Sequence, residues 1–93
     1  MDDRVVIGQL VKSKSGRDKG RYFLVLSIDP ENRIAFLVDG EKRGINNPKK
    51  KNICHIQVTN VVKKEFAQKV KEGFLPSDRD LRRYLKSLEL TKV

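Results

Sequence analysis

Two short segments of the chain concentrate lysine and arginine side chains in a pattern suited to binding phosphate. Residues 12–21 and residues 42–51 each hold five of the 21 basic side chains of the 93-residue sequence. Lysine supplies a point charge and arginine a planar fork of donors, and both match the oxygens of a phosphate group. If the fold brings the two segments together, they form one cationic face. The candidate binding residues are Lys12, Lys14, Gly16, Arg17, Lys19, Gly20, Arg21, Lys42, Arg43, Lys49, Lys50, Lys51 and Asn52.

Gly16 and Gly20 bracket the tip of the first segment. Without a Cβ atom, glycine adopts a positive φ at little cost and lets backbone amides approach a phosphate closely. The turn itself is also a sufficient reason for both glycines. Between them, Arg17, Asp18 and Lys19 are expected to face solvent.

Asparagine side chains accompany the second segment. Asn46, Asn47 and Asn52 offer donors and acceptors for sugar or base edges, beside the lysines at residues 49–51. A solvated charged surface is the competing interpretation of this lysine run. Its glycine, proline and asparagine content predicts an irregular loop over residues 42–51.

Side chains suited to catalysis or metal binding are sparse. Cys54 has only His55 beside it, and the sequence holds no second cysteine or histidine, no phosphate-binding GxxxxGK[ST] loop, no HExxH and no nucleophile elbow. We therefore expect no enzyme, no cofactor and no metal. Cys54 is expected in or near the core, and His55 as a structural residue or an RNA contact. Tyr22 is the one candidate for stacking on a base, with ordinary packing as the alternative.

The overall composition indicates one domain with a strong positive charge. The formal net charge is +9 over 93 residues, which favours a polyanionic partner, nucleic acid before an anionic membrane surface. A charge that only keeps a small protein dissolved is the alternative. The first residues, MDDRVV, resemble neither a secretory signal nor a membrane span, and a lone cysteine forms no internal disulfide, so a cytoplasmic location is expected.

Short apolar runs separated by turns predict a mainly β structure in the first part of the chain. They end at Val11 and cover residues 22–28, 34–38 and 53–58, with turn residues at 30–32. Four short strands protect little apolar area in an open sheet, so closure into a small barrel over residues 1–59 is expected. An SH3-like barrel is the predicted type, although the periodicity alone does not distinguish it from another five-stranded barrel.

The periodicity changes after residue 60 and predicts a pair of short helices over residues 60–93. Val62, Phe66 and Val70 recur every four residues before Gly73, which is a suitable C-terminal stop. After Pro76, a second helix is predicted with one apolar stripe. Its start is marked by Ser77 and Asp80, and its stripe consists of Leu81, Tyr84, Leu85 and Leu88. We expect this extension to pack on the barrel, and docking on another protein is the alternative.

Two sequence patterns resemble a known family. Gly8, Val11, Gly16, Gly20 and Val25 fit the spaced glycines and apolar positions of the KOW motif, which occurs in ribosomal proteins and transcription elongation factors. The segment NNPKKKNICHIQVTN, residues 46–60, resembles the PKxKNxxHxQ signature of small bacterial KOW-domain RNA-binding proteins, which are similar to a family of archaeal and eukaryotic large-subunit ribosomal proteins. The basic SDRDLRRYL near the C-terminus departs from the more acidic tail expected there.

The resemblance implies an SH3-like barrel that binds RNA, most of all ribosomal RNA, without turnover. The partner is then RNA or the large ribosomal subunit, with no membrane and no small-molecule substrate, and the protein is expected to be a monomer. The alternative is a protein-interaction module of the elongation-factor type that binds polymerase or a ribosomal protein, through the barrel or the helix of Val62, Phe66 and Val70. General nucleic-acid binding, including DNA, is a third possibility.

Overall fold

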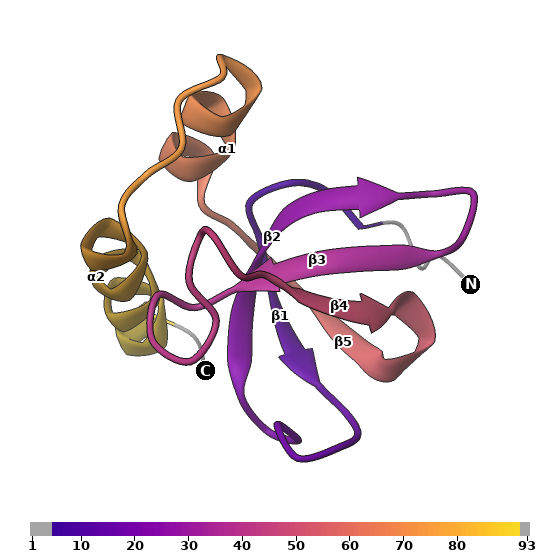
Figure 1. Cartoon of the computed structure of the whole chain (residues 1–93). Helices are drawn as coiled ribbons and strands as arrows, with labels where there is room; N and C mark the ends of the chain where they lie inside the picture. The colour runs from indigo at the N-terminus through magenta and orange to yellow at the C-terminus, as the bar shows by residue number, and fades with distance from the viewer. Residues whose placement is uncertain (1–4, 92–93) are drawn as a thin grey trace.

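Five strands are followed by two helices along the chain, as expected for a mainly β protein with a helical C-terminal part (Figure 1). The computed structural model describes residues 5–91, so the expected outer limits of the barrel and tail, residues 1 and 93, lie outside the described residues. The elements are β1 (Gln9–Ser13), β2 (Tyr22–Asp29), β3 (Ile34–Val38), β4 (Lys49–Asn52), the 3₁₀ turn η1 (Ile53–His55), β5 (Ile56–Val62), α1 (Lys64–Lys71) and α2 (Asp78–Thr91).

The strands form one antiparallel sheet in the order β4-β3-β2-β1-β5. β4 and β5 are the two ends of this order, yet only the three residues of η1 separate them along the chain. The sheet must therefore curl until its two ends approach each other at η1. Shifts in strand register between Gln9 and Val11 and between Val25 and Ser27 contribute to the bend.

The sheet is apolar on both faces, and each face has its own buried cluster. Inside the curl lie Val11, Phe23, Val25, Ala35, Leu37 and Ile56. On the outer side, strand residues pack against the helices, and this cluster consists of Leu10, Leu24, Val38, Phe66, Leu81, Tyr84, Leu85 and Leu88. Burial of both faces explains why the sequence of β2 is almost continuously apolar instead of alternating.

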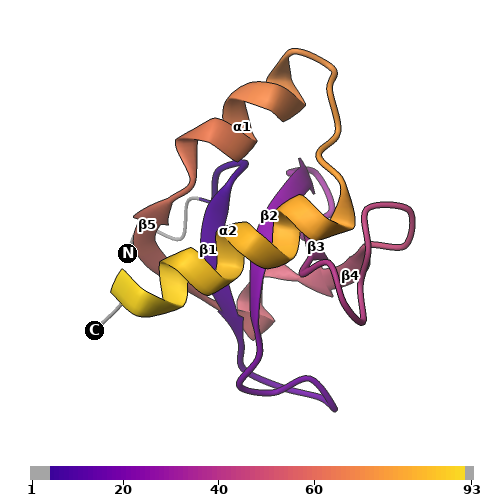
Figure 2. The same ribbon diagram turned by 90° about the vertical axis from the view of Figure 1, so that its left-hand side faces the viewer.

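The second helix packs on the sheet, as predicted. α2 crosses over β1 and β2 (Figure 2), and all four residues of its predicted apolar stripe are buried. The ring of Tyr84 meets the ring of Phe66 from α1 edge to face, with centroids 6.2 Å apart. The predicted C-terminal end of the first helix and the predicted start of the second helix are also confirmed. Gly73 has φ +88° just after α1, and the Ser77 Oγ accepts a hydrogen bond from Asp80 N at 3.2 Å.

Three predicted details of the secondary structure are wrong. The loop expected over residues 42–51 ends in β4, because residues 49–52 pair with β3 through backbone hydrogen bonds. Residues 53–55 form a 3₁₀ turn instead of the start of a strand, and Cys54 is exposed there instead of lying in or near the core. β5 runs through Val62, so α1 begins at Lys64 and not near residue 60. Neither helix within residues 5–91 is long and apolar enough to cross a membrane.

Candidate nucleic-acid interface

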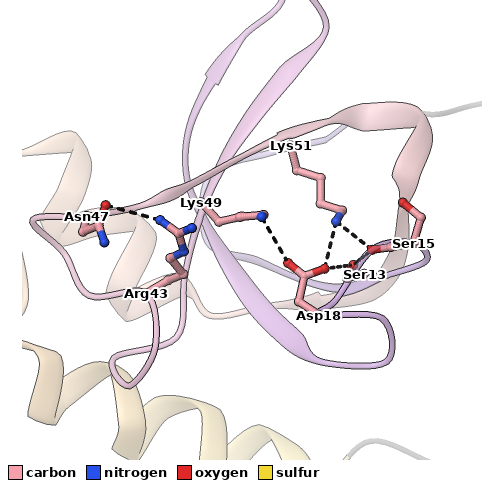
Figure 3. A network of polar contacts seen from close by, with 7 residues as sticks. All are labelled: Ser13, Ser15, Asp18, Arg43, Asn47, Lys49 and Lys51. Atoms are coloured by element: carbon pink, nitrogen blue, oxygen red, sulfur yellow. Dashed lines mark hydrogen bonds and ion pairs between the residues drawn. The ribbon is translucent and has the colours of Figure 1, made fainter.

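The fold brings the two basic segments together. β4 carries Lys49 and Lys51 to the loop between β1 and β2, where both ammonium groups face the carboxylate of Asp18 (Figure 3). The distances from Lys51 Nζ and Lys49 Nζ to the nearest Asp18 oxygen are 2.8 Å and 3.9 Å. The convergence expected from the sequence is therefore present.

A surface pocket lies between the two segments. It has a volume of about 500 Å³, and we call it the loop pocket. Five basic side chains and one acidic side chain line it, from both segments: Arg17, Arg21, Lys42, Arg43 and Lys49, with Asp18. Such a concentration of one charge around a concave surface attracts anions.

Asp18 joins the two segments. The prediction that it faces solvent is wrong. Its side chain is 15% exposed and accepts hydrogen bonds from Lys51 Nζ at 2.8 Å and Ser13 Oγ at 2.7 Å. Burial acts to raise the pKa of Asp18, but these hydrogen bonds and the charges of Lys51 and Lys49 outweigh it, so the pKa lies below its ordinary value. Asp18 is thus ionised at neutral pH and holds its loop against β4.

Lys51 has a structural position. Only 9% of its side chain is exposed, and its Nζ also donates to the backbone oxygen of Ser15 at 2.8 Å. Strand alternation explains the contrast with its neighbours, because successive side chains point to opposite faces. Lys49 and Lys51 point toward Asp18, whereas Lys50 and Asn52 are exposed. Asn52 Oδ1 accepts a hydrogen bond from Cys54 N at 2.9 Å and so caps the 3₁₀ turn.

A second carboxylate, that of Asp39, is buried and organises the other side of the loop pocket. Its Oδ2 accepts a hydrogen bond from Arg21 Nη2 at 2.6 Å, and its Oδ1 accepts from the backbone N of Glu41 and of Arg43, each at 2.9 Å. Burial alone raises the pKa of Asp39, yet these donors together lower it below its usual value. Asp39 therefore fixes Arg21 and the loop that carries Lys42.

The remaining predicted residues divide between exposed and packed positions. Among the basic ones, the exposed set is Lys14, Arg17, Lys19, Lys42 and Lys50. Gly16 and Gly20 are exposed and have φ +84° and +90°, so the turn requires glycine at both. Lys12 lies on the helix side of the sheet, with its Nζ 5.6 Å from the centre of the Tyr22 ring. Tyr22 also packs against the outer cluster, so a base stacking there must displace Lys12.

The two organising carboxylates were missed by the sequence reasoning. The available signal for Asp18 was its position as a lone acid between Arg17 and Lys19, whereas Asp39 lies between Val38 and Gly40 and has no such signal. Within residues 5–91 no three His, Cys, Asp or Glu side chains are grouped closely enough to hold a metal ion. His55 is exposed, and its backbone oxygen accepts a hydrogen bond from Lys14 N at 2.8 Å.

No known protein family matches the chain, and no curated protein is similar enough to it to count as a relative. The resemblance to KOW proteins therefore rests on the spaced glycines and on residues 46–60.

Proposed function

We propose that this protein binds RNA through the loop pocket and the exposed lysines around it. One observation carries the proposal: two basic segments, more than 20 residues apart in the sequence, place five basic side chains around a single pocket. Phosphate contacts supply most of the sequence-independent affinity for nucleic acid. The protein acts by binding, without turnover, in the cytoplasm, and ribosomal RNA is the partner that the KOW resemblance favours.

We further propose that the curled sheet is a KOW-type SH3-like barrel extended by the C-terminal helices. The topology supports this because the first and last strands of the hydrogen-bonded order, β4 and β5, adjoin each other through η1. The inner cluster also supports it, since it combines Leu37 of β3 with Ile56 of β5, although β2 and β1 lie between these strands in the sheet.

The loop pocket is preorganised for an anion. Asp18 and Asp39 hold the backbone and some of the basic side chains in place before a ligand arrives, and so lower the entropy that binding must remove. Arg17 and Lys42, one from each segment, are exposed and line the pocket. In the proposed complex these two side chains meet the phosphates directly.

The proposal is tested by charge reversal at one residue of each segment. We expect Arg17→Glu and Lys42→Glu each to weaken binding to a fluorescein-labelled RNA hairpin, measured by anisotropy over a series of KCl concentrations. Loss of one phosphate contact lowers the slope of log affinity against log salt by about one. Lys71→Glu is the matched control, because Lys71 is an exposed base on α1 that does not line the loop pocket.

If Arg17→Glu and Lys42→Glu remain folded and bind RNA with the same affinity and salt slope as the Lys71→Glu control, the loop pocket is not an RNA site. A DNA duplex measured at the same salt concentrations separates RNA preference from general nucleic-acid binding. Sedimentation of the tagged protein from its native lysate, with sequencing of the RNA in each fraction, tests the ribosomal assignment. Enrichment of one rRNA region in the large-subunit fraction is the expected result.

A protein-interaction module remains the second candidate because of one exposed apolar pair. Phe74 and Leu75, in the connection between α1 and α2, are 67% and 58% exposed. The helix face of Phe66 and Val70 does not offer a docking surface, since Phe66 is fully buried and Val70 packs against the outer cluster. If this candidate is correct, Phe74→Ser abolishes association with the large subunit or with polymerase while RNA affinity is unchanged.

A further inference from the structure

A second pocket adjoins the loop pocket on the side of α2. Its volume is about 610 Å³, and we call it the helix pocket. Four basic side chains line it: Arg21, Arg82, Arg83 and Lys86. Arg21 lines both pockets, so the two cationic surfaces are contiguous.

We propose that the helix pocket binds phosphates of the same RNA strand that occupies the loop pocket, so that the RNA-binding surface continues past Arg21 onto α2. This inference rests on the proposed function and adds to it, because α2 becomes part of the interface as well as a cover for the sheet. Two adjoining cationic pockets with a shared arginine suit a polyanion with repeating charges. A free phosphate ion needs only one of them.

The two pockets are held rigidly relative to each other. Gly40, with φ +79°, lies directly against α2, and a Cβ atom at this position would be 2.5 Å from the backbone oxygen of Asp78 and 2.9 Å from the Cβ of Leu81. Arg82 Nη1 donates to the backbone oxygen of Gly40 at 2.6 Å, and Ile45 N donates to Asp78 Oδ1 at 2.8 Å. The start of α2 is therefore attached to the loop that bears Lys42 and Arg43.

The charge balance leaves the α2 side of the helix pocket cationic. Two acidic residues line the helix pocket, Asp39 and Glu41. The Asp39 carboxylate accepts hydrogen bonds from Arg21 and two backbone amides, and the Glu41 carboxylate lies 3.6 Å from Arg21. Arg83 is 73% exposed and pairs with Asp80 at 3.0 Å, and Lys86 is exposed one turn further along α2. The acids are thus balanced mainly at Arg21, while the bases of α2 line the opposite side.

Lys86→Glu tests the proposal, with Arg79→Glu as the matched control. Both residues are exposed on α2, but only Lys86 lines the helix pocket, so the control makes the same change in net charge on the same helix. The probe is a fluorescein-labelled single-stranded RNA of about 12 nucleotides, within the range of known single-strand binding sites. Anisotropy is measured against KCl concentration, and thermal unfolding by circular dichroism checks that each variant is folded.

We expect Lys86→Glu to weaken binding and to lower the salt slope by about 0.7, the value for one phosphate contact on a single strand, and Arg79→Glu to change the slope much less. Equal behaviour of the two variants overturns the inference. If Arg17→Glu still weakens binding in that case, the proposed function stands and the interface ends at Arg21. If the parent protein binds the RNA hairpin but not the single-stranded probe, the inference is wrong and the proposed function stands. If it binds neither RNA in a salt-dependent way, both are wrong.

Discussion

Lys51 and Lys50 are adjacent in β4, and substitution of each is predicted to have a different effect. Lys51 is 9% exposed and donates to Asp18 and to the backbone oxygen of Ser15, whereas Lys50 is exposed. Methionine keeps much of the apolar stem of lysine and removes the ammonium group. We therefore expect Lys51→Met to destabilise the fold and Lys50→Met to leave its stability unchanged.

The magnitude follows from the contacts that Lys51 loses. Each hydrogen bond that involves a charged group contributes about 1.5–3 kcal/mol, and breaking a fully buried ion pair costs about 3–5 kcal/mol. Asp18 keeps its bond from Ser13 and the nearby charge of Lys49, so the expected loss is about 2–4 kcal/mol. A domain of 93 residues has a total stability of about 5–14 kcal/mol, so the melting temperature should fall by about 10–30 °C.

Urea and thermal unfolding monitored by circular dichroism provide the free energy of unfolding and the melting temperature of each variant. The double variant Asp18→Asn with Lys51→Met should recover part of the loss, since it leaves no unpaired charge. Two results would refute the reasoning. One is a Lys51→Met protein as stable as its parent, and the other is a Lys50→Met protein that loses as much stability as Lys51→Met.

Four further predictions concern the carboxylates and the contacts of α2. Stability should fall as the pH drops below about 4. Asp18 and Asp39 have lowered pKa values in the folded protein, so the unfolded chain takes up protons first as the pH falls. The stability that these carboxylates contribute is complete above the pKa of the unfolded chain and is lost as the pH falls through the pKa of the folded protein. Asp39→Asn should flatten the dependence of melting temperature on pH in this range. Gly40→Ala should cost at least about 1–3 kcal/mol in urea unfolding, because φ is +79° and the new Cβ would lie 2.5 Å from the Asp78 oxygen. Leu81→Ala, at a fully buried position against the sheet, should cost about 2–5 kcal/mol in the same assay.

Much of the fold could be predicted because apolar patterns report burial directly. β2, the turn after it, the end of α1 at Gly73 and the cap of α2 at Ser77 follow from local chemistry. β4 could not be predicted in this way, since three consecutive lysines show no apolar alternation and the strand forms through backbone pairing with β3. The start of α1 was misplaced because Val62 fits the period of the helix but belongs to β5.

The candidate site could be predicted as a set of charges but not as an arrangement. The sequence shows which residues are basic and that they occur in two segments. Whether a given lysine is exposed or paired depends on what lies opposite it in the fold, and Asp18 comes from 33 residues away to meet Lys51. The contribution of α2 depends likewise on its packing against Gly40, which no local pattern indicates.

The lysines of β4 have a further consequence for how molecules of this protein meet. β4 is an end strand of the hydrogen-bonded order, and its outer side offers backbone donors and acceptors to a strand from another chain. The exposed Lys50 and the half-buried Lys49 make such pairing unfavourable, because two copies would place like charges side by side. The same composition that favours a polyanion thus discourages edge-to-edge aggregation, and substitutions that neutralise β4 remove both effects together.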